Sequence, residues 1–245
     1  MKLEADTHCH TIASGHAYST VVENAKVARE KGLKLIAITD HGPSLPGGPH
    51  LYHFGNLKVL PRVIENVYIL RGVEANILDY EGRLDLPERY LKDLDIVLAG
   101  FHTYCYPGGS VEENTKALIN AMQNPYVDII VHPGNPEFLI DIDKFVEAAA
   151  EYDVAIEINN SSFTVSRRGS EENCLQIAKK AKEVGAKIAV GSDAHICFDV
   201  GFFDKALMVI KESGIEEQNI LNVSYLKLID YLKEKGRDFS FVKEF

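Results

Sequence analysis

The stretch TVVENAKVAREKGLKLIAITDHG, residues 20–42, combines two kinds of pattern and ends in a polar cluster. In residues 20–32 the apolar side chains recur on one helical face, and Gly32 follows as a C-terminal cap, which is typical of an amphipathic helix. Residues 33–40 form a short run rich in Leu and Ile, as in a buried strand. The stretch therefore predicts a helix that leads directly into a strand.

The same alternation of short apolar runs and longer amphipathic segments continues along the chain. We predict seven strands, at residues 2–8, 33–40, 67–75, 96–102, 128–133, 154–160 and 187–193. We predict helices at residues 20–32, 112–124, 143–153, 170–185 and 224–236. Because strands alternate with helices and no break in composition separates them, we expect a single parallel α/β domain over residues 1–245.

Composition limits the class of protein. The 245 residues are 46% hydrophobic and 25% charged, which is ordinary for a globular protein. No apolar run approaches the roughly 20 residues that cross a bilayer, and the first residues lack a signal-peptide core, so we expect a cytoplasmic protein. Four scattered cysteines indicate reduced thiols. The net charge of −10 argues against long nucleic acid and anionic membranes as partners, and the oligomeric state is left open.

Residue types that bind metals stand where the predicted strands end. In a parallel barrel the carboxyl ends of all strands face the same way, so side chains at these positions converge on one mouth. Six of the seven predicted strands end in this way; the exception is the strand at 154–160. The residues concerned are His8, His10, His41, Glu74, His102, His132, Asp193 and His195.

Imidazole and carboxylate ligands suit zinc, manganese or iron. His8 and His10, two residues apart on a strand, point to the same face and can hold one ion together. With His16 on the following loop there are nine candidate ligands, which is too many for one tetrahedral ion. Two or three ions fit this number better, with Glu74 as a bridge between them.

A family resemblance supports this interpretation. The motifs HCHTIASGHAYST, AITDHGP, GVEANI, AGFH, VHPGNP and GSDAH occur in this order along the chain. They resemble the motif series of the PHP (polymerase and histidinol phosphatase) superfamily, and in particular its YcdX-type branch of bacterial probable phosphatases. The resemblance spans essentially the whole chain and implies a distorted (β/α)7 TIM-like barrel with a trinuclear metal centre, usually of zinc.

The resemblance also implies which residues hold which ion. The first ion would be held by His8, His10, Glu74 and Asp193. The second would be held by Glu74, His102 and His132, and the third by His16, His41 and His195. All nine positions carry the expected residue type.

Such a centre suits the hydrolysis of a phosphate ester. Coordination lowers the pKa of water from 15.7 toward roughly 7, which supplies hydroxide at neutral pH, and clustered ions offset charge on phosphate oxygens. We therefore predict a metal-dependent phosphatase that acts on a small phosphorylated substrate, with three zinc ions, or manganese or iron in their place. Glu74, Asp193 and His195 are the expected catalytic residues.

Four further residues are candidates for substrate binding. Arg167 and Arg168 precede a predicted helix, where a guanidinium can grip phosphate in a bidentate manner, although solvated arginines are common on surfaces. His50 and His53 lie in or beside the Pro- and Gly-rich loop at 43–50, which follows the second strand and is a candidate wall of the site. Their alternative role is packing at the surface.

Other functions remain open at this stage. An amidohydrolase-like enzyme also has a His-x-His motif on its first strand and an Asp on its last, but it typically has a longer chain and a bridging lysine. A phosphodiesterase or nuclease acting on a dinucleotide or a DNA end is compatible with the acidic charge. A non-catalytic PHP accessory module is the third alternative. The identity of the phosphate ester is not encoded in any motif.

Overall fold

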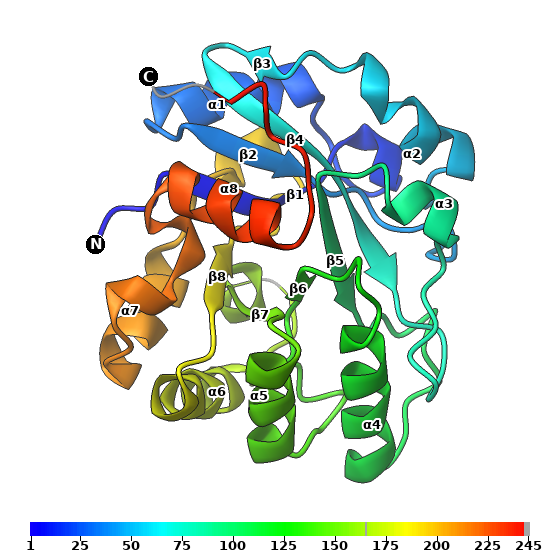
Figure 1. Ribbon diagram of the computed structural model, residues 1–245, viewed down its shortest axis with the longest axis vertical. Helices are drawn as coiled ribbons and strands as arrows, with labels where there is room; N and C mark the ends of the chain where they lie inside the picture. The colour runs from blue at the N-terminus through cyan, green and yellow to red at the C-terminus, as the bar shows by residue number, and fades with distance from the viewer. Residues whose placement is uncertain (165, 243–245) are drawn as a thin grey trace.

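Seven parallel strands form the centre of the computed structural model, which describes residues 1–164 and 166–242 (Figure 1). They are β1 (Ala5–Cys9), β2 (Leu35–Ile38), β4 (Val67–Asn76), β5 (Ile96–Gly100), β6 (Ile129–Ile130), β7 (Ala155–Asn159) and β8 (Ile188–Gly191), hydrogen-bonded in that order. Beyond the end of β8, the amide of Asp193 donates to the carbonyl of His8 at 2.9 Å and the amide of His10 to that of Ala194 at 2.9 Å. These bonds bring β8 beside β1 and nearly close the sheet, which confirms the predicted TIM-like (β/α)7 barrel.

The helices surround this sheet, and most follow a strand. The α-helices are α1 (Val21–Glu30), α2 (Leu51–Asn56), α3 (Glu88–Leu91), α4 (Val111–Met122), α5 (Ile142–Glu151), α6 (Glu171–Val184), α7 (Asp204–Ser213) and α8 (Tyr225–Glu234). Short 3-10 turns are η1 (Ile12–Ser14), η2 (Leu57–Val59), η3 (Ser161–Phe163), η4 (Cys197–Asp199), η5 (Glu217–Asn219) and η6 (Leu221–Val223).

The predicted strands and the five predicted helices are all present, with ends that differ by a few residues. Gly32 has a φ of +77°, as expected of a glycine just beyond a helix. Four elements were missed: α2, α3, α7 and the short strand β3 (Val63–Ile64), which pairs antiparallel with β4. Three of them are too short to show a periodic pattern. The residue before α7, Phe203, cannot cap the helix with its side chain, so the usual start signal is lacking.

Apolar residues pack on both sides of the sheet. The larger core lies between the strands and the surrounding helices. The barrel interior is filled by residues such as Leu35, Leu70 and Leu98, and it is closed at one end by Leu228 and Leu232 of α8. Figure 1 shows α8 lying across the end of the barrel that faces the viewer. The opposite end, where the strands finish, is left for the polar residues.

Alternation along the strands determines which side chains reach that end. Leu70 of β4 points into the barrel, so Glu74, four residues later, does so too. By the same alternation, His102 points into the barrel, because it lies four residues after Leu98, an inward-facing residue of β5. In β1 the pairing register with β2 shifts between Asp6 and Cys9, and this irregularity lets both Ala5 and His8 face the interior.

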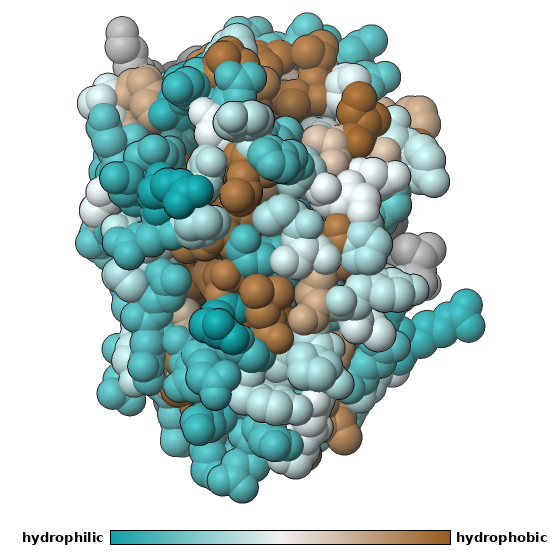
Figure 2. Space-filling view, turned by 90° about the vertical axis from the view of Figure 1, so that its right-hand side faces the viewer, coloured by the Kyte–Doolittle hydropathy of each residue, from teal (hydrophilic) through white to brown (hydrophobic). Residues whose placement is uncertain are grey.

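The side of the molecule that bears α2, α3 and α4 mixes polar and apolar residues (Figure 2). Apolar residues gather in the upper part of this view and near its centre. Among the described residues, no helix combines the length and the apolar character needed to cross a membrane.

Asn222 of η6 fastens β1 to β8, and its replacement tests barrel closure. Its buried side-chain amide donates to the carbonyls of Ala5 and Val190, each at 2.8 Å, and accepts from the amide of Val190 at 3.0 Å. Asn222→Ala leaves these buried groups without partners and should lower the free energy of unfolding by about 3 kcal/mol. Urea unfolding measures the change. The exposed Asn56→Ala control should change it by less than about 0.5 kcal/mol, and equal effects would contradict the role given to Asn222.

Candidate metal centre

The carboxylate of Glu74 lies at the centre of a group of imidazoles beyond the strand ends. Its Oε1 is 3.0 Å from His102 Nε2 and 2.7 Å from His132 Nε2. Its Oε2 is 2.7 Å from His41 Nδ1 and 3.3 Å from His8 Nε2. Each Glu74 oxygen thus faces a different set of histidines, as a carboxylate that bridges two cations does.

The first group of candidate ligands has the dimensions of a coordination shell. His8 Nε2 and His10 Nε2 lie 3.0 Å apart, and Asp193 Oδ1 is 3.6 Å from the former and 3.2 Å from the latter. Glu74 Oε2 is 3.3 Å and 3.4 Å from the same two nitrogens. Zinc ligands at 2.0–2.2 Å in a tetrahedron lie roughly 3.3 Å from each other, and these five distances of 3.0–3.6 Å are close to that value.

The two carboxylate oxygens of this group have no hydrogen-bond partner, although Glu74 and Asp193 are buried. A buried carboxylate oxygen without a donor carries a large desolvation cost unless a cation compensates it. The donor set and these unpartnered oxygens therefore fit a divalent metal ion.

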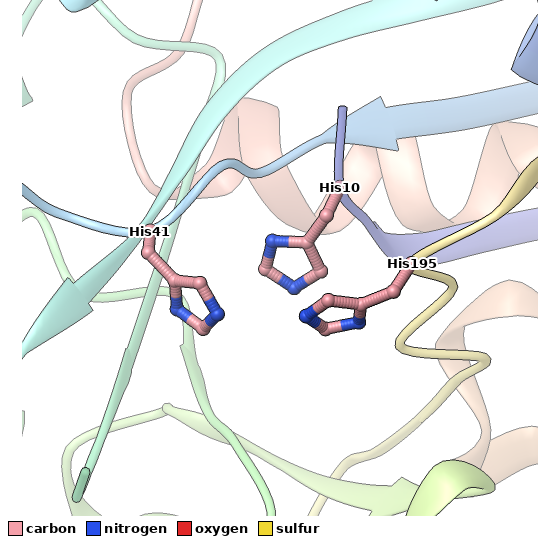
Figure 3. Close-up of side chains that lie close together, drawn as sticks. All are labelled: His10, His41 and His195. Atoms are coloured by element: carbon pink, nitrogen blue, oxygen red, sulfur yellow. The ribbon is translucent and has the colours of Figure 1, made fainter. Parts of the chain in front are cut away.

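A second concentration of imidazoles lies closer to solvent. His16 Nε2 and His195 Nε2 are 3.0 Å apart, and the ring of His41 stacks against that of His16 with centroids 5.0 Å apart. The ligand atoms of His10, His41 and His195 also fall within 4.8 Å of one another (Figure 3). His41 therefore lies between the pair His16 and His195 and the carboxylate of Glu74. His10 lies close to both sets of residues.

Hydrogen bonds on the far side of the rings determine which nitrogen faces the centre. Nδ1 of His16 is 3.0 Å from the carbonyl of Ser14, and Nδ1 of His195 is 3.0 Å from the carbonyl of Asp193. A carbonyl only accepts, so each Nδ1 carries the hydrogen and each Nε2 keeps a free electron pair. The same reasoning applies to His8, whose Nδ1 is 2.8 Å from a carboxylate oxygen of Glu157.

Ser14 determines in a similar way which ring nitrogen of His10 carries the hydrogen. Its hydroxyl donates its one hydrogen to Asp40 at 2.7 Å and accepts from the amide of His41 at 3.2 Å. Because that hydrogen is used, Nδ1 of His10, at 3.2 Å from the same oxygen, must donate. Nε2 of His10 is then free for a metal ion. Asp40 acts on His10 through Ser14, whereas Asp6 accepts from the backbone amides of His8, Ser192 and Gly201.

Glu157, which was not predicted from the sequence, lies in β7, the strand without a proposed ligand. Its side chain is buried; one oxygen contacts His8, and the other accepts from the amide of His132 at 2.9 Å and from Asn159 at 3.1 Å. The signal was present, because an acid inside an apolar strand is rarely buried unless it is paired. Glu157 orients His8 and ties β6 to β7.

Charge and burial shift the pKa values in this region in different directions. Burial, and then the charge of Arg167, lower the pKa of His132 to about 3, so this imidazole is neutral, as ligation requires. Burial also lowers the pKa of His10. Burial opposes the charge on His8 as well, but Glu157, Glu74 and Asp193 together hold the pKa of its imidazole well above the usual range. The region around His8 therefore favours a positive charge.

The backbone at three site residues has the left-handed conformation that side chains rarely adopt. The φ angle is +37° at His132, +55° at Asp193 and +47° at Arg167. Such conformations persist where the surrounding structure over-determines them, and they concentrate at functional sites. At His132 and Asp193 they fix candidate ligands at the ends of β6 and β8.

A cavity of about 640 Å³ opens directly onto the imidazoles. It is formed by loops that follow β1, β2, β5, β6, β7 and β8. Its lining residues are His16, His41, Leu45, Pro46, Phe101, His102, Thr103, Tyr104, Asn135, Glu137, Ser161, Ser166, Arg167, Asp193, His195 and Asp199.

The four predicted substrate-binding residues have different locations. Arg167 lines the cavity and donates to Asp193 Oδ2 at 2.9 Å, whereas Arg168 is exposed and does not line the cavity. His50 caps α2 by accepting from the amide of Tyr52 at 3.2 Å. His53 lies 3.4 Å from Asp40 and lines a separate cavity of about 700 Å³ beside α2. The geometry thus brings Arg167 alone of the four to the candidate centre.

Comparison with known proteins connects this site to a family. The family model of the PHP domain matches residues 6–132. A probable phosphatase of Thermoanaerobacter sp. (strain X514) is 64% identical over 238 residues, covering 97% of both chains. One from Acetivibrio thermocellus is 54% identical over 235 residues, covering 96% of this chain and 97% of that protein.

Solved structures share the fold at low sequence identity. A histidinol phosphate phosphatase from Lactococcus lactis, in complex with zinc, L-histidinol and phosphate, superimposes with a TM-score of 0.59 at 17% identity. The match covers 88% of this chain and 95% of that one.

Removing the carboxylate behind His8 tests the positioning role of Glu157. Glu157→Gln lets the amide nitrogen face His8, so the tautomer that offers Nε2 loses its acceptor, and metal affinity should fall about 10- to 100-fold. Competition with a chromogenic chelator measures this affinity without reference to turnover. Glu151→Gln, at an exposed position on α5, is the matched control; equal affinity in both variants would refute the role.

Proposed function

The chain belongs to the PHP domain family, and we propose that it is a metal-dependent phosphatase that hydrolyses a small phosphate monoester in the cytoplasm. The observation that carries this proposal is the convergence of Glu74, Asp193 and their imidazoles at the base of an open cavity. The phosphatase assignment agrees with the relatives, which are named probable phosphatases over nearly their whole length. We also take residues 1–245 to form one domain.

Three metal ions, of zinc or of manganese or iron, are proposed at this site. His8, His10, Glu74 and Asp193 would hold the first; Glu74, His102 and His132 the second; and His16, His41 and His195 the third. The unpartnered oxygens and the matching donor distances support the first of these sets most directly. When bound, such ions act as Lewis acids that lower the pKa of water and offset negative charge on phosphate oxygens.

The residues of the chain then bind and orient the ester. Arg167 faces the cavity with a guanidinium that donates to Asp193 through Nη1, and its remaining N–H groups are suited to phosphate oxygens. Asp193 has one oxygen toward Arg167 and the other toward His8 and His10, so it links the phosphate-binding side to the centre. Glu74, Asp193 and His195 are the residues proposed to take part in catalysis, and they do so as ligands beside the phosphate.

Removing a central ligand tests the proposed function. His10→Ala and Glu74→Ala should each lower kcat/KM for p-nitrophenyl phosphate more than about 100-fold, which corresponds to roughly 3 kcal/mol at the barrier. Chelation should abolish turnover of the wild-type protein, and added zinc or manganese should restore it. Hydrolysis of p-nitrophenyl acetate or of an anilide in preference to the phosphate would instead favour an amidohydrolase-like enzyme.

The two neighbouring arginines provide a matched pair for phosphate binding. Arg167→Ala should raise KM for phosphate esters and lower kcat/KM about 10- to 100-fold, because a charge-assisted hydrogen bond to phosphate is lost. Arg168→Ala, which removes an exposed guanidinium, should change kcat/KM less than about twofold. A loss that is equal in the two variants would show general electrostatic attraction and would contradict the specific role of Arg167.

A further inference from the structure

We infer that the ester bears a planar apolar leaving group, such as an aromatic ring, and no second phosphate. This inference rests on the proposed function and deepens it by naming the class of substrate. It comes from the chemistry of the cavity walls beyond the candidate metal ligands.

The apolar and aromatic residues of the cavity lining come from the loops that follow β2 and β5, which also contribute the polar His41, His102 and Thr103. Leu45 and Pro46 come from the first loop, and Phe101 and Tyr104 from the second. Phe101 is 6% exposed and stacks on Tyr106 with ring centroids 4.0 Å apart, which makes it a fixed surface. Tyr104 is 81% exposed, so its ring is available to a ligand. Aromatic rings of this kind favour flat partners, with which they stack.

The opposite wall is polar and comes from the loops that follow β7 and β8. Ser161, Ser166 and Arg167 belong to the first loop, and Asp193 and His195 to the second. The positive charge of Arg167 draws the phosphate to this side. The rest of the ester must then extend toward the wall of Leu45 and Tyr104, where an apolar group is favoured over a hydroxylated one because it displaces water from apolar surface.

The size of the cavity agrees with this division. Its volume of about 640 Å³ is far larger than a phosphate group requires and falls within the usual range for pockets that hold small organic molecules. The substrate therefore has a leaving group large enough to reach both walls.

Charge at the rim argues against a second phosphate. Among the described residues that line the cavity, Arg167 is the only arginine or lysine, and it already contacts Asp193. The exposed carboxylates of Glu137 and Asp199 lie on the same lining, and Glu137 is held in place by Thr103, which donates to it at 3.0 Å. A second dianionic group would meet like charge there without a cation to pair with.

Two pairs of synthetic esters test these features with the metal-loaded protein. Benzyl phosphate and ethyl phosphate release alcohols of similar acidity but differ in the aromatic ring. Butyl phosphate and its analogue with a second, terminal phosphate share the four-carbon chain and differ in the added dianionic group, so kcat/KM is compared per phosphate group. The wild-type protein should show kcat/KM at least about 10-fold higher for the benzyl ester and at least about 10-fold lower for the bisphosphate.

Variants then locate the effects. Tyr104→Ala should reduce the benzyl-to-ethyl ratio about 3- to 10-fold, mainly through KM, and should weaken binding of benzylphosphonate measured by calorimetry. Tyr52→Ala is the matched control, because Tyr52 is 79% exposed and does not line this cavity. Glu137→Gln should raise relative use of the bisphosphate.

The outcomes separate the inference from the proposed function. If all four esters and p-nitrophenyl phosphate are inert with metal-loaded protein, the proposed function fails. If the esters are hydrolysed but the benzyl-to-ethyl ratio is near one, or if Tyr104→Ala and Tyr52→Ala behave alike, the inference of an aromatic leaving group is overturned and phosphatase activity stands. Preferred hydrolysis of the bisphosphate would overturn the charge argument in the same way.

Discussion

A fully buried carboxylate surrounded by imidazoles is the constraint on which this structure depends. Glu74 is removed from water, and both of its oxygens face histidine nitrogens rather than backbone donors. Burial opposes its ionisation, yet the surrounding histidines hold the pKa of its carboxyl well below the usual range. Because the carboxylate of Asp193 is buried close to the same histidines, the site contains two negative charges that positive charge must compensate. Divalent cations compensate these carboxylates better than protons on the imidazoles do, because each cation also binds the free electron pairs of the histidine nitrogens.

The barrel provides this arrangement through its backbone and through an outer layer of hydrogen bonds. Parallel strands bring their carboxyl ends together, a register shift in β1 turns His8 inward, and His132, just beyond β6, has a left-handed backbone conformation. Behind the imidazoles, Glu157 and Ser14 determine which nitrogen faces the centre. The loops that carry His16, His41, His102 and His195 also line the cavity, so the proposed metal chemistry and substrate selection depend on the same loops.

Position at a strand end made the convergence of the candidate residues predictable from sequence, because parallel topology alone brings residues such as His41 and His102 to one mouth. The outer layer was harder to predict. Glu157 precedes the end of its strand by two residues, and Ser14 acts through a hydroxyl whose partners come from separate segments. The helix α7 lacked a start signal, and the separation of Arg167 from Arg168 depends on a left-handed backbone conformation that no motif encodes.

The proposed chemistry requires that the convergent histidines and carboxylates hold several metal ions. Elemental analysis by mass spectrometry tests it most directly, on protein that has been equilibrated with zinc and then freed of unbound metal. We expect close to three zinc ions per chain, with loss of the Glu74 carboxylate in Glu74→Ala lowering the content by at least one. Fewer than two ions per chain in the wild-type protein would contradict it.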